Sequence, residues 1–425
     1  MNVVLIGSGG REHALAQKIH ESKSLNKLYC IPGNPGTKIF SENKSINITD
    51  KDLISDFCTE HKIDLVVIGP EKPLADGLAD FLRSKGIKVF GPDSEAAAIE
   101  SHKSFAKNLM NKYAIPTASF VEFMSDEIVN AKAAIRNMDY PLVIKADGLA
   151  AGKGVIICED FHQAKLTLDE IFNNKIFGDA GNKIIVEEFM FGEEASIFAI
   201  TDGHDFICLP AAQDHKRAGD NDTGKNTGGM GAYAPAPLIT KNLQDKIELK
   251  IIKPTIKALS EEGKTFIGCL YAGLMITNSG PKVVEFNCRF GDPETQTVLP
   301  LLDGDFLELL YTAASGKLDK NCVKYNGGSS VCVVIASGGY PDEYKSGYGI
   351  SGLVNHSKNI SIFHAGTKED NGKIITAGGR VLGVTSFIPE LDLKKAKDIA
   401  YEAANKIHFP DMYFRKDIAD KAIKK

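Results

Sequence analysis

Three features are missing from this chain of 425 residues, and each absence excludes a class of protein. Its eight cysteines include no Cys-x-x-Cys pair and most lie in apolar runs, so we expect buried thiols rather than disulfides or zinc ligands. No apolar run is long enough to span a bilayer, and no basic region with a cleavage site precedes the first expected strand. No long basic run appears, and the formal net charge is −5, which argues against nucleic acid as a partner. We therefore expect a cytoplasmic enzyme that binds neither membranes nor nucleic acids.

The composition is that of a globular protein with several domains. A hydrophobic content of 43% and a charged content of 25% are ordinary, and the length suggests two to four domains. In the first hundred residues, continuous apolar strands alternate with helices, which indicates a parallel, doubly wound sheet. The expected strands cover residues 3–6, 27–31, 65–68 and 88–90. The expected helices include residues 12–22 and 75–85. Ligands of such sheets bind beyond the carboxyl ends of the strands, where Gly- and Pro-rich turns follow here.

The first of these turns, Gly-Ser-Gly-Gly at residues 7–10, has three interpretations. As a dinucleotide fingerprint it is defective, because Glu12 occupies the third glycine position and no acidic residue ends the second strand. A glycine turn at a helix N-terminus still suits a phosphate, through backbone groups at Gly9 and Gly10. We favour binding of a phosphorylated substrate over a purely structural turn, and binding of NAD is the least favoured interpretation.

The most informative stretch is residues 283–297, Val-Val-Glu-Phe-Asn-Cys-Arg-Phe-Gly-Asp-Pro-Glu-Thr-Gln-Thr. On a strand, Glu285, Asn287 and Arg289 project from one face. The alternate residues are expected to face a core: Val284, Phe286 and Cys288. Carboxylate and amide oxygens suit Mg²⁺, and a guanidinium can clamp a carboxylate or phosphate. A half-exposed edge strand with solvated charges is the alternative, but the acidic turn that follows favours a metal–phosphate site.

A second candidate site begins with an expected strand that ends at Lys145. The loop that follows contains Gly148, Gly152 and Gly154, whose backbone N–H groups could approach phosphates closely. Lys145 would add a point charge. The spacing excludes a P-loop, whereas a glycine hairpin between two strands remains an alternative.

Two further segments allow both a functional and a plain interpretation. The apolar strand at residues 184–189 breaks just after two carboxylates and could offer main-chain groups to an adenine and a carboxylate to a ribose, but taken alone the segment is better explained by surface charge at a strand end. Asp-His-Lys-Arg at residues 214–217 precedes Thr-Gly-Gly-Met-Gly at 227–231. These residues are either a solvated charge cluster or a mobile anion-binding loop.

Taken together, these motifs resemble one family. Residues 9–13, 32–37, 214–231 and 289–296 resemble the phosphoribosylamine–glycine ligases (glycinamide ribonucleotide synthetases) of the ATP-grasp superfamily, and the resemblance covers essentially the whole chain. It implies a multidomain α/β fold. A Rossmann-like domain is expected at residues 1–101 and an ATP-grasp domain at 102–325, with a mobile lid at about 120–192. A small C-terminal α/β domain is expected at 326–425.

The resemblance also implies the role of individual residues. Mg²⁺ or Mn²⁺ would be held by Glu285 and Asn287. Glycine would be held by the catalytic residues Arg289, Asp292 and Asp214. ATP would be bound by Lys103, Lys145, Gly148, Gly152, Gly154, Glu187, Glu188, Phe189 and Glu194. Phosphoribosylamine would meet Gly9, Gly10, Gly33, Asn34, Thr37 and Lys216. Asn221 and Lys225 stand where the family pattern predicts glycine and proline. These departures affect the expected rigidity of the loop and not the expected reaction.

The activity that the resemblance implies is ligation of glycine to 5-phosphoribosylamine. ATP would activate glycine as glycyl phosphate, and the products would be glycinamide ribonucleotide, ADP and phosphate. We expect a monomer. Three alternatives stay open at this point: an ATP-grasp ligase for another carboxylate, an NAD-dependent dehydrogenase, and a catalytically silent nucleotide sensor.

Overall fold

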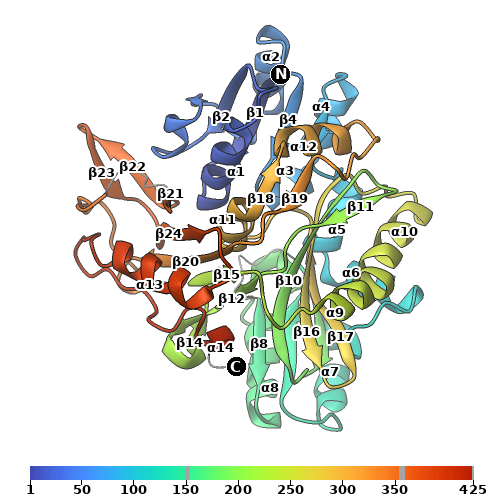
Figure 1. Ribbon diagram of the computed structural model, residues 1–425. Helices are drawn as coiled ribbons and strands as arrows, with labels where there is room; N and C mark the ends of the chain where they lie inside the picture. Colours follow the sequence, from blue (N-terminus) through green and yellow to red (C-terminus); the bar gives the residue numbers. More distant parts are fainter. Residues whose placement is uncertain (149–153, 354–358, 424–425) are drawn as a thin grey trace.

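The computed structural model describes residues 1–148, 154–353 and 359–423. The N-terminal region is a five-stranded parallel sheet in the order β3-β2-β1-β4-β5, drawn in blue in Figure 1. Its strands are β1 (Asn2–Gly7), β2 (Lys27–Pro32), β3 (Glu42–Asn43), β4 (Leu65–Ile68) and β5 (Val89–Phe90). Its helices are α1 (Gly10–His20), α2 (Lys51–Glu60), α3 (Glu71–Ala75), α4 (Leu78–Ser84) and α5 (Ser94–Ser101). The predicted parallel, doubly wound arrangement is confirmed.

The start of one predicted helix is wrong in this region. The helix predicted at residues 75–85 is present as α4 but begins only at Leu78, because Ala75 ends the preceding helix α3. Gly77 lies between them with a φ of +78°, a left-handed conformation that glycine adopts without steric cost. The chain therefore changes direction where the apolar pattern alone suggested continuity.

The central region contains two four-stranded sheets. One has the order β6-β9-β7-β8 and its own hydrophobic core, and the other has the order β11-β10-β16-β17. The first is built from β6 (Phe120–Met124), β7 (Leu142–Ala146), β8 (Val155–Cys158) and β9 (Lys183–Glu188), with α7 (Ile128–Ile135) and α8 (Phe161–Phe172). The second is built from β10 (Glu193–Thr201), β11 (Phe206–Cys208), β16 (Gly268–Thr277) and β17 (Gly280–Asn287). Further helices of this region are α6 (Lys103–Lys112), α9 (Lys241–Ile247), α10 (Lys253–Glu261), α11 (Glu294–Val298) and α12 (Phe306–Ala314).

The third region is a five-stranded sheet in the order β12-β15-β20-β24-β21, partly covered by α13 (Leu393–Ala404), which is drawn in red in Figure 1. Its strands are β12 (Gln213–Asp214), β15 (Gly231–Ala234), β20 (Ser329–Ala336), β21 (Ile360–His364) and β24 (Arg380–Ile388). Strands from the middle of the chain thus pair with the C-terminal sheet. The predicted boundaries at residues 101 and 325 stay predictions.

Small elements complete the fold. They are the paired strands β13 (Arg217–Gly219) and β14 (Thr223–Asn226), β18 (Leu302–Gly304) and β19 (Val323–Tyr325), β22 (Thr367–Asp370) and β23 (Lys373–Thr376), and the helix α14 (Asp420–Ile423). All eight cysteines are free thiols and six of them are buried, as expected. Across the described ranges, no helix combines the length and apolar character that crossing a membrane requires.

Candidate functional site

Strand β17 presents the predicted metal ligands beside a bulge. Glu285 pairs with Gly273 and Val283 pairs with Leu274, so Val284 is the extra residue on this strand. Phe286 and Cys288 are buried as predicted, but Val284 is only half-buried, because the bulge breaks the alternation there. The predicted core position of Val284 is therefore wrong. Glu285 and Asn287 are half-buried, so both can reach a ligand.

A buried group that we call the lysine cluster consists of Lys107, Lys145 and Glu187. The Glu187 carboxylate lies 3.0 Å from the Lys107 Nζ and 3.0 Å from the Lys145 Nζ, and all three residues are at most 5% exposed. Lys145 Nζ also donates to the Val284 carbonyl over 3.1 Å. Burial lowers the pKa of Lys107 to about 8, against the opposing charge of Glu187. The side chain of Glu187 thus pairs with two ammonium groups, and its main chain lies in register with β6 and β7, so its adenine contact stays a prediction.

Lys103 lies next to this cluster at the start of α6. Its Nζ donates to the Gly148 carbonyl over 3.1 Å, and its backbone N–H donates to the Asp147 carbonyl over 3.1 Å. Burial and the charge of Lys145 lower the pKa of Lys103, although nearby carboxylates oppose them. Strands β7 and β8 pair antiparallel. Just before β8, the Gly154 carbonyl accepts a hydrogen bond from the Ala146 N–H. Gly152 lies outside the described residues.

A second group, which we call the acidic cluster, consists of Glu194, Asp214 and Glu285 around Lys216. Lys216 Nζ lies 2.8 Å from Glu194 Oε2 and 3.6 Å from Glu285 Oε1. Burial raises the pKa of Asp214 to about 8, because the neighbouring carboxylates reinforce burial and Lys216 only partly offsets it. Burial also opposes ionisation of Glu285, but the charges of Lys216 and Lys145 outweigh it and lower the pKa of that carboxyl.

The donor set of the acidic cluster fits a divalent cation only in part. Carboxylates outnumber ammonium groups there, which favours a cation. In the described parts of the chain, however, no three His, Cys, Asp or Glu side chains converge as a ready metal site. Glu285 and Asn287 can therefore supply two oxygen ligands at most, which is the typical protein share of a Mg²⁺ site completed by phosphate oxygens.

Arg289 is held by two carboxylates from the N-terminal region. Its Nε donates to Glu71 over 3.2 Å and its Nη2 donates to Glu100 over 2.8 Å. Glu100 also accepts the backbone N–H of Cys288 over 2.8 Å. Neither Glu71 nor Glu100 could be predicted from the sequence, because neither residue belongs to a recognisable spacing with Arg289. Whether Arg289 contacts glycine stays a prediction.

Asp292 marks the point where all three regions meet. Its Oδ1 accepts from Gln296 over 2.8 Å, and its Oδ2 lies 3.4 Å from Arg380 Nη2. A Cβ at Gly9 would lie 2.9 Å from the Glu12 carboxylate and 3.6 Å from that of Asp292, so the first glycine turn packs here. Arg380 also donates to the backbone carbonyls of Gly228 and Asp292, over 2.6 and 2.8 Å. The sequence analysis missed this arginine, which lies in the C-terminal region.

The predicted substrate turn at residues 33–37 is held together by its own side chains. The Asn34 Oδ1 accepts the backbone N–H groups of Gly36 and Thr37, over 2.8 and 3.0 Å. Its Nδ2 donates to the Ser8 and His364 carbonyls, both over 2.8 Å. Asn34 and Thr37 are buried, and Gly33 has a φ of +71°. These residues build a rigid turn beside Gly9, and their predicted substrate contacts stay predictions.

The predicted nucleotide-binding residues Glu188 and Phe189, at the C-terminal end of β9, lie at the junction of the two central sheets. Glu188 accepts from Lys282 over 3.0 Å and from the Ser119 N–H over 3.2 Å. The Phe189 ring meets Phe191 edge-on, with centroids 4.9 Å apart. No described contact tests their predicted adenine or ribose roles.

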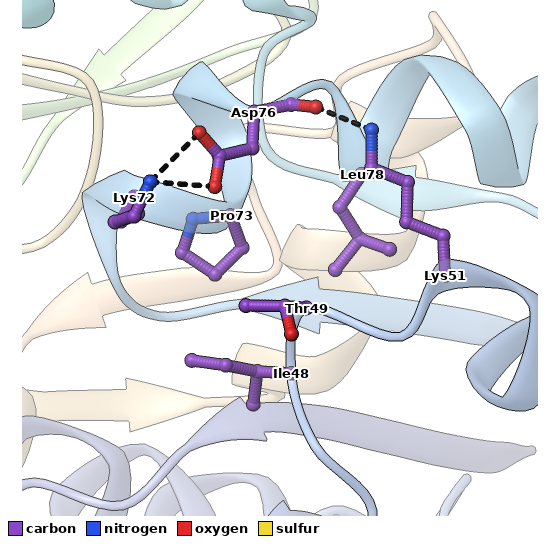
Figure 2. A pocket seen from close by; sticks show the side chains of 7 residues that line it. All are labelled: Ile48, Thr49, Lys51, Lys72, Pro73, Asp76 and Leu78. Atoms are coloured by element: carbon purple, nitrogen blue, oxygen red, sulfur yellow. Dashed lines mark hydrogen bonds and ion pairs between the residues drawn. The ribbon is translucent and has the colours of Figure 1, made fainter.

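A separate cavity of about 180 Å³ lies on the N-terminal region (Figure 2) and includes none of the predicted site residues. It is lined by Ile48, Thr49, Lys51, Lys72, Pro73, Asp76 and Leu78. Both lysines already donate to Asp76, one to its carboxylate over 2.9 Å and the other to its carbonyl. The Asp76 carboxylate thus balances Lys72, whereas Lys51 meets a neutral carbonyl, so the lining residues keep one net positive charge.

Comparison with known proteins covers the whole chain. The phosphoribosylglycinamide synthetase N domain matches residues 1–100, the ATP-grasp (A) domain matches residues 101–295, and the C domain matches residues 330–421. The phosphoribosylamine–glycine ligase of Caldanaerobacter subterraneus is 46% identical over 419 residues, which is 99% of each chain. The protein of that name from Escherichia coli O157:H7 is 44% identical over 430 residues, covering 100% of this chain and 99% of its own.

Solved structures agree with these matches. The crystal structure of the phosphoribosylamine–glycine ligase of Thermotoga maritima superposes with a TM-score of 0.84 at 32% identity, over 99% of this chain and 100% of that one. The biotin carboxylase domain of the Hydrogenobacter thermophilus 2-oxoglutarate carboxylase has a TM-score of 0.74 at 16% identity, over 97% and 91%, which shows a shared fold alone. The chain therefore has an ATP-grasp core between N- and C-terminal domains and belongs to the phosphoribosylglycinamide synthetase family.

Proposed function

We propose that this chain ligates glycine to 5-phosphoribosylamine at the expense of ATP, giving glycinamide ribonucleotide, ADP and phosphate in purine biosynthesis. Relatives named phosphoribosylamine–glycine ligase, 44–46% identical over nearly their full length, support the proposal. The structural observation that carries it is the position of Glu285, which lies 3.6 Å from the Lys216 Nζ and feels the charges of Lys145 and Lys103. A site with this charge arrangement suits a triphosphate together with a cation and a carboxylate substrate.

The chemistry requires activation of glycine before the amide forms. A carboxylate is a poor electrophile, since its leaving group would be oxide. Attack of the glycine carboxylate on the γ-phosphorus of ATP breaks the bond to ADP and forms glycyl phosphate. The amine of phosphoribosylamine then attacks the acyl carbon, phosphate leaves, and the amine loses a proton. Lys103, Lys145 and Lys216 would stabilise the negative charge that phosphoryl transfer moves between oxygens.

The proposed metal ligands are Glu285 and Asn287. Members of the ATP-grasp ligases generally use ATP with Mg²⁺, and Mn²⁺ has the same preference for oxygen ligands. A bound cation would neutralise phosphate charge during transfer. Because its pKa is lowered, Glu285 carries the negative charge that a cation requires.

We place the two other substrates on either side of residue 289. Arg289, Asp292 and Asp214 would hold glycine, while phosphoribosylamine would reach the turns at residues 9–10 and 33–37. This arrangement brings the amine to the carboxylate because Gly9 packs close to Asp292. The sheet β6-β9-β7-β8 would act as the predicted lid, since glycyl phosphate hydrolyses in water unless the site closes.

The test is an assay that follows ADP and the glycine amide together. We expect ADP release to require ATP, Mg²⁺, glycine and phosphoribosylamine, with one amide formed per ADP. Other amino acids and small carboxylates serve as competing substrates. Faster turnover with one of them would favour a different ATP-grasp ligase. Binding of Mg-ATP without any turnover would indicate a nucleotide sensor and refute the proposal.

A further inference from the structure

A hairpin follows directly after Lys216 and is held by the C-terminal end of the chain. The hairpin consists of β13, β14 and the turn between them, residues 217–226. Its main contacts outside the central region are with residues 415–421, which we call the C-terminal latch. The hairpin and the latch are separated by almost two hundred residues in the sequence, and a contact between them therefore depends entirely on the tertiary fold.

Arg415 is the centre of the latch. Its side chain is fully buried, and it donates from Nε and Nη2 to the two carboxylate oxygens of Asp417, over 2.8 and 2.7 Å. Its Nη1 donates across to the hairpin, to Asp222 Oδ1 and to the Arg217 carbonyl, both over 3.0 Å. All three guanidinium nitrogens are thus engaged, two by the latch and one by the hairpin. Such a planar fork cannot be reproduced by lysine.

Backbone contacts and a second ion pair extend the latch over the hairpin turn. The Asn221 N–H donates to Asp417 Oδ2 over 2.8 Å, and the Lys416 N–H donates to Asp220 Oδ1 over 2.8 Å. Lys421 Nζ lies 2.5 Å from Asp222 Oδ2. Asn221 and Asp222 have φ angles of +56° and +55°, a left-handed conformation that Asn and Asp adopt more readily than other non-glycine residues. The latch bonds hold the turn in this conformation.

The hairpin leads back to the acidic cluster through His215. Its backbone N–H donates to the Gly231 carbonyl over 2.9 Å and its carbonyl accepts from Met230 over 2.8 Å. Its imidazole is 1% exposed, and among the described residues neither ring nitrogen has a hydrogen-bond partner. Burial, reinforced by the charges of Arg415 and Lys421, lowers the pKa of His215 to about 3, so the ring is neutral. The neighbours of His215 in sequence, Asp214 and Lys216, belong to the acidic cluster instead.

We infer that Arg415 is a positioning residue of the active site: through Asp222 and the Arg217 carbonyl it fixes the hairpin, and the hairpin sets Lys216 between Glu194 and Glu285. The inference rests on the proposed ligase function. Arg415 touches no substrate in this arrangement. Its effect is on Lys216, which must keep its ammonium group beside the reacting phosphate. Without the latch, the hairpin loses the hydrogen bonds and ion pairs that hold its turn, and Lys216 loses its fixed position.

The test compares Arg415→Gln, Arg415→Lys and Asp222→Asn with the wild-type chain. Asp245→Asn is the control, because Asp245 pairs with Lys241 at the surface over 2.7 Å. We expect kcat for amide formation to fall roughly 10- to 100-fold in Arg415→Gln and less in Asp222→Asn. The dissociation constant of Mg-ADP should stay within about twofold of wild type, since Lys103 and Lys145 are untouched. Trypsin should cut faster at Arg217 or Lys225 in Arg415→Gln and in Asp222→Asn than in the wild type.

Each outcome supports or overturns the inference. A wild-type chain that makes no amide refutes the proposed function itself. An active wild type together with wild-type kcat in Asp222→Asn and Arg415→Lys refutes only the positioning role. Circular dichroism identifies a variant that fails to fold, and in that event the kcat of Asp222→Asn is decisive, since Asp222 is part-exposed. A loss of kcat together with weaker Mg-ADP binding would also contradict the inference, because it indicates general damage.

Discussion

The lysine cluster and the acidic cluster meet at β17 but carry opposite imbalances of charge. In the lysine cluster two ammonium groups share one carboxylate, and all three side chains are almost completely buried. In the acidic cluster three carboxylates surround Lys216, and the side chains of Glu194 and Glu285 are 40% and 36% exposed. One cluster is closed with an excess of positive charge. The other is open with an excess of negative charge.

This difference explains why one site can take both a polyanion and a cation. A nucleotide triphosphate brings negative charge that the excess of ammonium groups attracts, whereas a divalent ion brings positive charge that the excess of carboxylates attracts. Each excess of charge destabilises the ligand-free protein, and it is compensated when both ligands bind. Burial sets the cost of disturbing each cluster, because an unpaired charge destabilises the closed lysine cluster more than the open acidic cluster.

The largest expected effect tests whether the lysine cluster is structural. Glu187→Gln leaves Lys107 and Lys145 without their counter-charge in a buried setting, so we expect the free energy of unfolding to fall by about 4 kcal/mol. Urea denaturation measures it. Glu188→Gln is the matched control, because Glu188 is part-exposed and should change stability by less than about 1 kcal/mol. Equal losses in both variants would erase the distinction between the clusters.

The acidic cluster should respond in activity rather than in stability. Glu285→Ala removes a proposed metal ligand, so we expect kcat to fall at least about 100-fold with little change in the free energy of unfolding. Raising the Mg²⁺ concentration should recover part of the loss. Glu261→Ala, on the exposed face of α10, is the control. Near-normal turnover in Glu285→Ala would remove Glu285 from the metal site.

The pH dependence of stability offers a third test of the lysine cluster. Burial lowers the pKa of Lys107 to about 8, below its value in the unfolded chain, so between these two values the unfolded chain binds more protons. Stability due to Lys107 must therefore rise with pH above about 8. Relative to Lys107→Met, the wild type should gain about 2 kcal/mol between about pH 8 and 9.5. Lys112→Met, on the same helix but exposed, should run parallel to the wild type.

The smallest effect concerns a charge that belongs to neither cluster. Arg289→Lys keeps a positive charge but cannot reach Glu71 and Glu100 together, so its orientation is lost. We expect the KM for glycine to rise about tenfold while the KM for ATP stays unchanged. Arg136→Lys, at the exposed C-terminal end of α7, should leave both unchanged. An unaltered KM for glycine would show that Arg289 serves only to join the two regions.

Much of the fold and part of the site could be predicted from the sequence. The parallel N-terminal sheet, the strand that leads to Lys145 and the polar face of Glu285 and Asn287 follow from local periodicity. The bulge at Val284 and the break at Gly77 could not, because each is a one-residue irregularity inside an otherwise regular pattern. The predicted roles of individual residues toward ATP, glycine and phosphoribosylamine remain for the assays.

By itself, the sequence determined which segments are strands, which turns can approach a phosphate, and to which family the chain is related, because these properties reside in neighbouring residues. Only the tertiary structure decided which charges neutralise each other. Arg289 meets Glu71 and Glu100 across 218 and 189 residues, and Arg415 meets Asp222 across 193. No local spacing encodes such pairs, since burial brings them together only after separate sheets have packed around β17.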